Sequence, residues 1–324
     1  MKRKITKTFA TLLLSATCLT GCMGTTHKVS FSEYWKKDST AAKTDFTETL
    51  EYDVKYESNN ISTYYTLDYT NGKYKTELIA STEADGRKIY TYKTELTITA
   101  VYTFNGEIVE FNDKTLTEVK FEQSSTLRPI SSRKELISHS PAENVSSATP
   151  TEISHCYKQY DYTVETVYTG NGAGNCKVTK NGETPTTQED IFELDVEKYS
   201  YLDNEQLLFA IRGLKAVANN SSTFMVYSPF AKNGQKIKTT FAAKEGTQFS
   251  YLRNGTAVKE TIEYFPASLE IESQNPGATQ TAWFAATTDP QNNTYRNVML
   301  RLETPISYNL GTLVYQLSSA NFAE

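Results

Sequence analysis

The chain has 324 residues, with 33 Lys and Arg against 38 Asp and Glu and a formal net charge of -5 at pH 7. This acidic balance and the scattered basic residues exclude the basic face of a nucleic-acid-binding protein and a polybasic patch for a membrane surface. Tyrosine is abundant, with 22 residues beside 15 Phe and 2 Trp, and such rings are typical of pleated, half-buried sheets.

The first 22 residues follow the pattern of an export signal. Four basic residues within the first seven precede an apolar run over 8–20, which is too short for a membrane span of about 20 residues. The run Leu19-Thr20-Gly21-Cys22 resembles the lipobox of bacterial lipoprotein precursors. The resemblance implies cleavage before Cys22 and a diacylglyceryl group on its thiol. It also implies anchoring to the extracytoplasmic face of a bacterial membrane. The alternative is a plain signal peptide with a chance cysteine.

These features divide the chain into three parts. Residues 1–21 are expected to form a lipoprotein signal peptide, and residues 22–46 the lipidated cysteine and a polar tether in which Phe31, Tyr34 and Trp35 can dock as a short turn. Residues 47–324 are expected to form a single β-rich domain. A Pro- and Ser-rich stretch near 127–151 interrupts the alternating pattern and is interpreted as a crossover loop or a boundary between halves.

Most of the domain alternates between polar and apolar residues in runs of strand length. Before the crossover such runs cover 50–56, 65–69, 74–78, 88–104, 107–111 and 116–121, with hairpin turns predicted at Asn71-Gly72 and Asn105-Gly106. After it, strands are predicted over 157–168 and 176–180 around a glycine-rich tip at 170–174. Further strands are predicted over 224–227, 236–241, 248–252, 257–265, 269–272, 283–284, 297–302 and 312–317, with a turn at Asn254-Gly255.

One segment, 202–214, has helical periodicity instead. Asp203 and Gln206 have the spacing of a capping box, and Gly213 supplies a stop. Four apolar residues fall on one stripe, which must lie against a sheet: Leu207, Leu208, Ile211 and Leu214. The predicted fold class is mainly β, a strongly curved antiparallel sheet, or half-barrel, wrapped on one central α-helix.

This pattern resembles the LolA-like half-barrel, and in particular an uncharacterised branch of that group. The resemblance covers roughly 47–317 in architecture. It is sharpest at Tyr201-Leu202-Asp203-Asn204-Glu205, at Arg212-Gly213, and at Tyr308-Asn309-Leu310-Gly311-Thr312-Leu313-Val314-Tyr315. Better-known members shield acyl chains of lipids or lipoproteins in the concave face, and the resemblance implies a similar apolar concavity here.

Residues that could carry chemistry are few. The histidines are His27, His139 and His155, and neither they nor the cysteines have the spacing of a zinc site. His155 and Cys156 would point to opposite faces of a strand, which argues against a nucleophilic pair. A bridge between Cys156 and Cys176 stays open, although the predicted hairpin separates them. Asp203 is explained by capping. Arg212 could form a salt bridge or meet an anionic head group, but a cation favoured by the dipole at the helix end is the simpler account.

The surplus of aromatic residues is the remaining functional signal. Five rings are candidates to line an apolar cleft, although core packing explains them equally well: Tyr160, Tyr162, Tyr168, Tyr227 and Trp283. We therefore expect a non-catalytic, membrane-anchored protein that binds a hydrophobic or amphiphilic ligand, with no cofactor, no metal and no nucleic-acid partner. The alternatives are a structural or interaction protein of the envelope with a filled core, and an envelope hydrolase with paired carboxylates.

Overall fold

The structure is a computed structural model, and it describes residues 28–36, 45–59, 64–142, 150–272, 279–286 and 296–322. The predicted signal peptide and Cys22, the expected lipid attachment residue, lie outside the described residues. No helix within the described ranges is long and apolar enough to cross a membrane.

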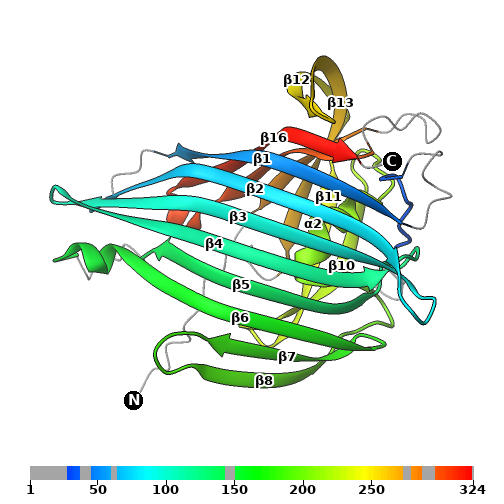
Figure 1. The fold of residues 1–324 in the computed structure, drawn as a ribbon, viewed down its shortest axis with the longest axis horizontal. Coiled ribbons are helices and arrows are strands. Elements are labelled where there is room, and N and C mark those ends of the chain that lie inside the picture. The colour runs from blue at the N-terminus through cyan, green and yellow to red at the C-terminus, as the bar shows by residue number, and fades with distance from the viewer. Residues whose placement is uncertain are drawn as a thin grey trace.

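A single large sheet curls into a barrel-like shape (Figure 1). Its hydrogen-bonded order is β8-β7-β6-β5-β4-β3-β2-β1-β16-β15-β14-β13-β11-β10-β9, and β12 pairs with β13 and β16. The strands are β1 (Phe46–Ser58), β2 (Thr66–Thr82), β3 (Lys88–Phe104), β4 (Glu107–Glu122), β5 (Pro129–Pro141), β6 (Tyr157–Gly170), β7 (Ala173–Lys180), β8 (Thr186–Glu193), β9 (Ser200–Tyr201), β10 (Ser221–Ser228), β11 (Asn233–Phe241), β12 (Glu245–Arg253), β13 (Thr256–Ile271), β14 (Gln280–Ala285), β15 (Met299–Pro305) and β16 (Gly311–Phe322).

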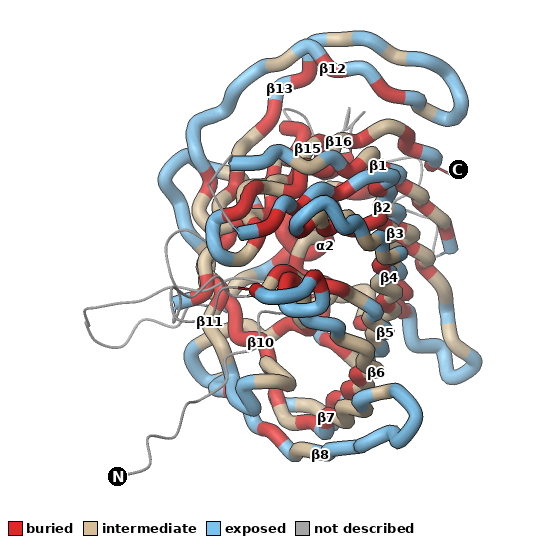
Figure 2. The backbone as a smooth tube through the Cα atoms, turned by 90° about the vertical axis from the view of Figure 1, so that its left-hand side faces the viewer, coloured by how far each residue is buried: buried red, intermediate tan, exposed pale blue. Residues whose placement is uncertain are grey.

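Neighbouring strands are antiparallel except where β9 meets β10 and β12 meets β16. Strands β1 to β8 form one continuous meander, and the chain then returns to place β16 beside β1. The predicted mainly β, strongly curved antiparallel sheet is therefore present, and the strand count makes it a barrel in outline (Figure 2).

Within the described ranges, side chains rather than paired backbone join the two ends of the sheet. A cluster of buried residues links β6, β7 and β8 to β10: Val164, Tyr168, Cys176, Phe192, Leu194, Met225 and Tyr227. The rings of Phe192 and Tyr227 stack with centroids 4.0 Å apart, and the Tyr227 hydroxyl donates to Asp190. We call this cluster the seam.

The segment expected to be a central helix lies inside the barrel but is short. It consists of a 3-10 turn, η2 (Asn204–Gln206), and α2 (Leu207–Ile211), and Figure 1 shows α2 within the curve of the sheet. The predicted capping box is confirmed. The Asp203 side chain accepts from the backbone of the segment, and the Asp203 backbone N–H donates to the Gln206 side chain. The helical spacing of apolar residues thus identified the right segment but overestimated the length of the helix.

Gly213 does not end this helix in a left-handed conformation. It gives room instead, because a Cβ there would lie 2.8 Å from the Trp35 ring and 3.0 Å from Phe31. Phe31 and Trp35 are 3% and 0% exposed. Trp35 packs on Phe209 at 4.6 Å and donates to the Tyr90 hydroxyl at 3.2 Å. Part of the expected tether is therefore packed into the core of the barrel.

Two local predictions are wrong. Asn71-Gly72 is not a hairpin turn but a β-bulge within β2, at the register shift between Thr70 and Lys73. Asn71 has φ 54°, and Gly72 is required because a Cβ would lie 2.5 Å from the Val54 carbonyl oxygen. The turns at Asn105-Gly106 and Asn254-Gly255 are confirmed by their hairpins.

The second error concerns the expected crossover at 127–151, since most of it is strand β5. Polar residues occupy both faces of this strand, which hid its two-residue period. Its prolines stand at the first and last positions, where a strand tolerates them. Residues 143–149 of the expected loop lie outside the described residues.

Candidate functional site

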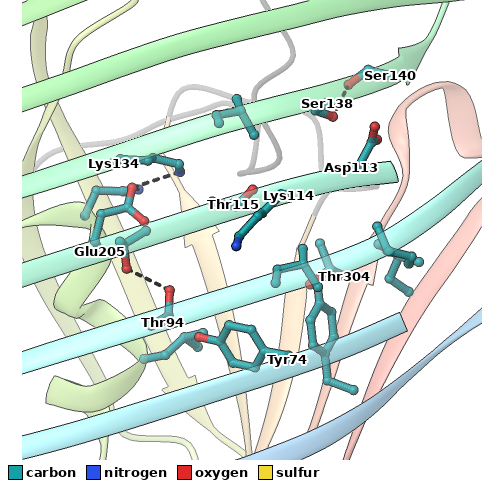
Figure 3. Close-up of a pocket in the computed structure, with 18 of the residues that line it drawn as sticks. Tyr74, Thr94, Asp113, Lys114, Thr115, Lys134, Ser138, Ser140, Glu205 and Thr304 are labelled. Atoms are coloured by element: carbon teal, nitrogen blue, oxygen red, sulfur yellow. Dashed lines mark hydrogen bonds and ion pairs between the residues drawn. The ribbon is translucent and has the colours of Figure 1, made fainter. Parts of the chain in front are cut away.

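A cavity of about 160 Å³ lies inside the barrel (Figure 3). One wall comes from β2 to β6, the other from β13 to β16, and η2 and α2 form the floor. Residues from every side supply its apolar lining, among them Tyr74, Leu96, Leu136, Leu208 and Tyr315. A cavity of this kind is the usual form of a small-molecule site, with apolar walls and a few polar groups.

A row of polar side chains crosses the apolar wall beside the floor. Thr76, Thr94, Thr117 and Lys134 lie in register on β2, β3, β4 and β5, and we call them the polar row. The hydroxyls of Thr94 and Thr117 are hydrogen-bonded at 2.7 Å. The next residues on the same face, two positions away on each strand, also line the cavity wall: Tyr74, Leu96, Thr115 and Leu136.

Lys134 forms an ion pair across the cavity floor. Its ammonium lies 2.9 Å from the carboxylate of Glu205 in η2, and the side chains are only 16% and 17% exposed. The Asn204 amide also donates to Glu205, at 3.1 Å. Figure 3 shows Lys134 and Glu205 pointing toward one another from the sheet and the inner segment. The pair therefore fixes η2 against β5 at the place where a ligand would contact both.

Below the floor, Asp203 holds the same segment to the sheet. Its carboxylate accepts from Ser132 at 2.6 Å and from Tyr168 at 2.9 Å, and from the Glu205 backbone at 2.9 Å. Burial raises the pKa of the Asp203 carboxyl, and the hydrogen bonds offset that effect only in part. Burial and the Asp203 charge also raise the pKa of the Tyr168 phenol.

At the opposite end of the cavity, Asp113 and His139 fill the fork where β4 and β5 separate. Asp113 accepts from the His139 backbone N–H at 2.9 Å and lies 2.8 Å from His139 Nδ1. The imidazole stacks on Phe111 with centroids 3.8 Å apart. Burial raises the pKa of Asp113. Within the described part of the chain, the His139 ring is hydrogen-bonded through Nδ1 to the Asp113 carboxylate.

The five candidate rings do not share one site. Tyr160 and Tyr162 are half-buried and line the cavity. Tyr168 and Tyr227 belong to the seam. Trp283 is not among the cavity-lining residues: it is out of phase with Gln280, which lines the cavity from the same strand, and it stacks on Tyr264 with ring centroids 4.6 Å apart. The structure therefore places Tyr168, Tyr227 and Trp283 outside this cavity, and ring content alone does not reveal which face of a strand a ring occupies.

Sequence reasoning missed the polar row, Glu205 and the Asp113–His139 pair. The row could have been found only from strand register, because its four members stand in four different strands. Lys134 and Ser138 fell in the stretch interpreted as a crossover. Asp113 had no local signal at all, since His139 lies in another strand.

The remaining reactive residues are placed apart. Cys156 and Cys176 are free and buried. Cys156 ends a short 3-10 turn, η1 (Ile153–Cys156), just before β6. Cys176 lies on β7, opposite Thr166 of β6. His155 belongs to the same turn and is exposed beside Glu152. Among the residues with described positions, no group of three or more His, Cys, Asp or Glu side chains could hold a metal ion.

No protein-family model matches the chain, and no curated protein matches it. Among solved structures, it is similar to the crystal structure of a β-barrel-like protein of a domain of unknown function, DUF1849, from Brucella abortus. The two are 8% identical with a TM-score of 0.45, and the match covers 86% of this chain and 98% of that one. The barrel described above stands on the strand pairing of this chain itself.

Proposed function

We propose that this chain is a membrane-anchored extracytoplasmic lipoprotein that binds a hydrophobic or amphiphilic ligand without catalysis. The observation that carries the proposal is the cavity between the sheet and α2, whose lining is mostly apolar and includes Leu96, Leu136 and Leu208. It favours binding over a purely structural role with a filled core. The resemblance to LolA-like half-barrels fits the same arrangement, an apolar segment held in the concave side of a curved sheet.

The ligand proposal is tested on a chain that lacks residues 1–22 and retains every described residue. Native mass spectrometry of this protein from a bacterial host should detect a bound amphiphile in stoichiometric amount. Leu208→Trp, which fills the cavity from its floor, should abolish the bound species. Ile108→Trp is the control, because Ile108 is 61% exposed and does not line the cavity. Protein that stays empty and also ignores fluorescent fatty acids would contradict the proposal.

The anchoring proposal rests on the lipobox-like run ending in Cys22. In the full chain, Cys22→Ala should move the protein from the membrane pellet to the soluble fraction, because acyl chains contribute about 0.8 kcal/mol per buried CH₂ to membrane affinity. Cys18→Ala is the matched control, since Cys18 precedes the expected cleavage point and should leave the protein in the pellet. Continued sedimentation of the Cys22 variant with membranes would overturn the lipoprotein assignment.

A further inference from the structure

We infer that the cavity selects an amphiphile whose head group is uncharged and carries hydroxyls, such as a long-chain monoacylglycerol, over fatty acids and fatty amines. The inference rests on the proposed ligand-binding function and names the chemistry of that ligand. It follows from the charges and the hydrogen-bonding groups that face the cavity.

Each charged side chain among the described residues that line the cavity already has a partner. Lys134 pairs with Glu205 at 2.9 Å, and Lys114 pairs with Glu95 at 2.8 Å. Asp113 lies 2.8 Å from His139 Nδ1 and accepts from the His139 backbone as well. A carboxylate or an ammonium that entered from water would therefore lose its hydration without gaining an unpaired opposite charge, which is costly in an apolar site.

An uncharged head group with hydroxyls can replace its hydrogen bonds to water with hydrogen bonds to the protein. The polar row offers the hydroxyls of Thr94 and Thr117 at the cavity wall, and these can both donate and accept. Glu205 has accepting capacity beyond its bonds to Lys134 and Asn204. A glycerol-like head can exchange its hydrogen bonds to water for hydrogen bonds to these groups, so its desolvation is compensated.

The rest of the ligand has an apolar place next to the polar row. Tyr74, Leu96 and Leu136 follow the row on the neighbouring strands, and Leu208 and Tyr315 face them from the floor and the far wall. One apolar chain attached to the head would cover these side chains. The arrangement thus matches an amphiphile with its head at the Lys134–Glu205 pair.

The test compares three ligands that share one chain and differ in the head: monooleoylglycerol, oleate and oleylamine. Each is titrated at neutral pH into the delipidated chain without residues 1–22, with intrinsic fluorescence and competition as readouts. The unmodified protein should bind monooleoylglycerol about tenfold more tightly than either charged ligand. Oleate or oleylamine binding as tightly as the glycerol ester would overturn the inference.

Two substitutions should each raise the affinity for one of the charged ligands. Glu205→Gln leaves Lys134 without its carboxylate, so oleate should gain about tenfold in affinity. Lys134→Met leaves Glu205 unpaired, so oleylamine should gain instead while oleate stays weak. Glu118→Gln is the matched control, since Glu118 pairs with Lys93 away from the cavity, and it should leave the order of the three ligands unchanged.

The outcomes separate the two proposals. If none of the three ligands binds and the purified protein is empty, the ligand-binding function itself fails. If all three bind with similar affinity, or if Glu205→Gln leaves oleate binding unchanged in a folded protein, the ligand-binding function stands and head-group selection by charge balance is overturned. Circular dichroism of each variant establishes that it is folded.

Discussion

Arg212 is a buried charge with four hydrogen bonds. It binds both carboxylate oxygens of Glu48, at 2.5 and 2.9 Å, and donates to the carbonyls of Arg296 and Asn297. The two side chains are 3% and 2% exposed. Burial by itself would lower the pKa of Arg212, but the Glu48 carboxylate outweighs it and the net direction is upward. The ion pair considered from the sequence is thus present, with its partner in β1.

We expect Glu48→Leu to destabilise the protein by about 3–5 kcal/mol, because it leaves a buried guanidinium without its counter-charge. The double variant Glu48→Leu with Arg212→Met should be less destabilised than the sum of the single variants, since neither charge then remains buried and unpaired. Urea unfolding followed by fluorescence measures both quantities. Additive losses would contradict this account of the pair.

The buried Asp203 carboxyl predicts an unusual pH dependence. Its pKa in the folded protein lies above the ordinary value of 3.8, so the folded state binds the proton more tightly than the unfolded state. The associated stability is fully present below the unfolded pKa and is lost as the pH rises through the folded pKa. The Tm of the native chain minus that of Asp203→Asn should therefore increase as the pH falls from neutrality toward about 3.8.

Asp85 provides a control of opposite sign. It is exposed, and hydrogen bonds from Arg87 hold its pKa below 3.8, so its contribution is present above the unfolded pKa and lost as the pH falls. The difference in Tm between the native chain and Asp85→Asn should change in the reverse direction. A constant difference for Asp203→Asn across the titration would contradict the assignment of a raised pKa.

At the scale of elements, α2 serves two purposes with neighbouring residues. Phe209 is 1% exposed and packs among Trp35, Tyr92 and Phe121, with ring centroids 4.6 to 5.4 Å away. Leu208, next to it, is half-buried and lines the cavity. The sequence pattern placed Leu208 on the buried stripe of the helix. In the structure, the short segment directs the Phe209 side chain into the core and leaves Leu208 at the cavity.

The difference between the two residues can be measured. Phe209→Ala should lower the free energy of unfolding by about 3–5 kcal/mol, because it removes a ring from a closely packed cluster. Leu208→Ala should lower it by only about 1 kcal/mol, because it enlarges an existing cavity. Chemical denaturation of the two variants is the test, and equal losses would show that the floor of the cavity is part of the core.

How much of each element could be read from the sequence depended on the range of its interactions. Alternation located β3 and β6, and the Asn-Gly turn at Asn105-Gly106 followed from local backbone preference. The same dipeptide at Asn71-Gly72 lies in a bulge of β2, where Gly72 pairs with Val54 on β1 and no Cβ would fit. Strand β5 escaped notice because its inner face is polar where it meets the cavity. The pattern thus failed mostly at the site, where inward-facing polar residues replace apolar ones.

For the whole molecule, the pairing of β1 with β16 completes the barrel. Val54 lies opposite Tyr315, and the Tyr52 hydroxyl donates to the Met299 carbonyl. Removal of residues 311–322 should expose unpaired edges on both β1 and β15, and such edges promote aggregation. We expect the truncated chain to be insoluble at concentrations where the complete chain is monodisperse by gel filtration. A soluble, folded truncation would show that β16 is dispensable.

The same pairing sets an order of events in time. A hairpin such as that of β3 and β4 forms in about 1–10 μs once both strands exist. Strand β1, however, cannot find its second partner until synthesis reaches β16, which at about 5–20 residues per second takes on the order of ten to fifty seconds. Its edge thus stays unpaired about one million to fifty million times longer than a hairpin needs to form. The half of the sheet made first must therefore remain soluble while it waits for the last strand.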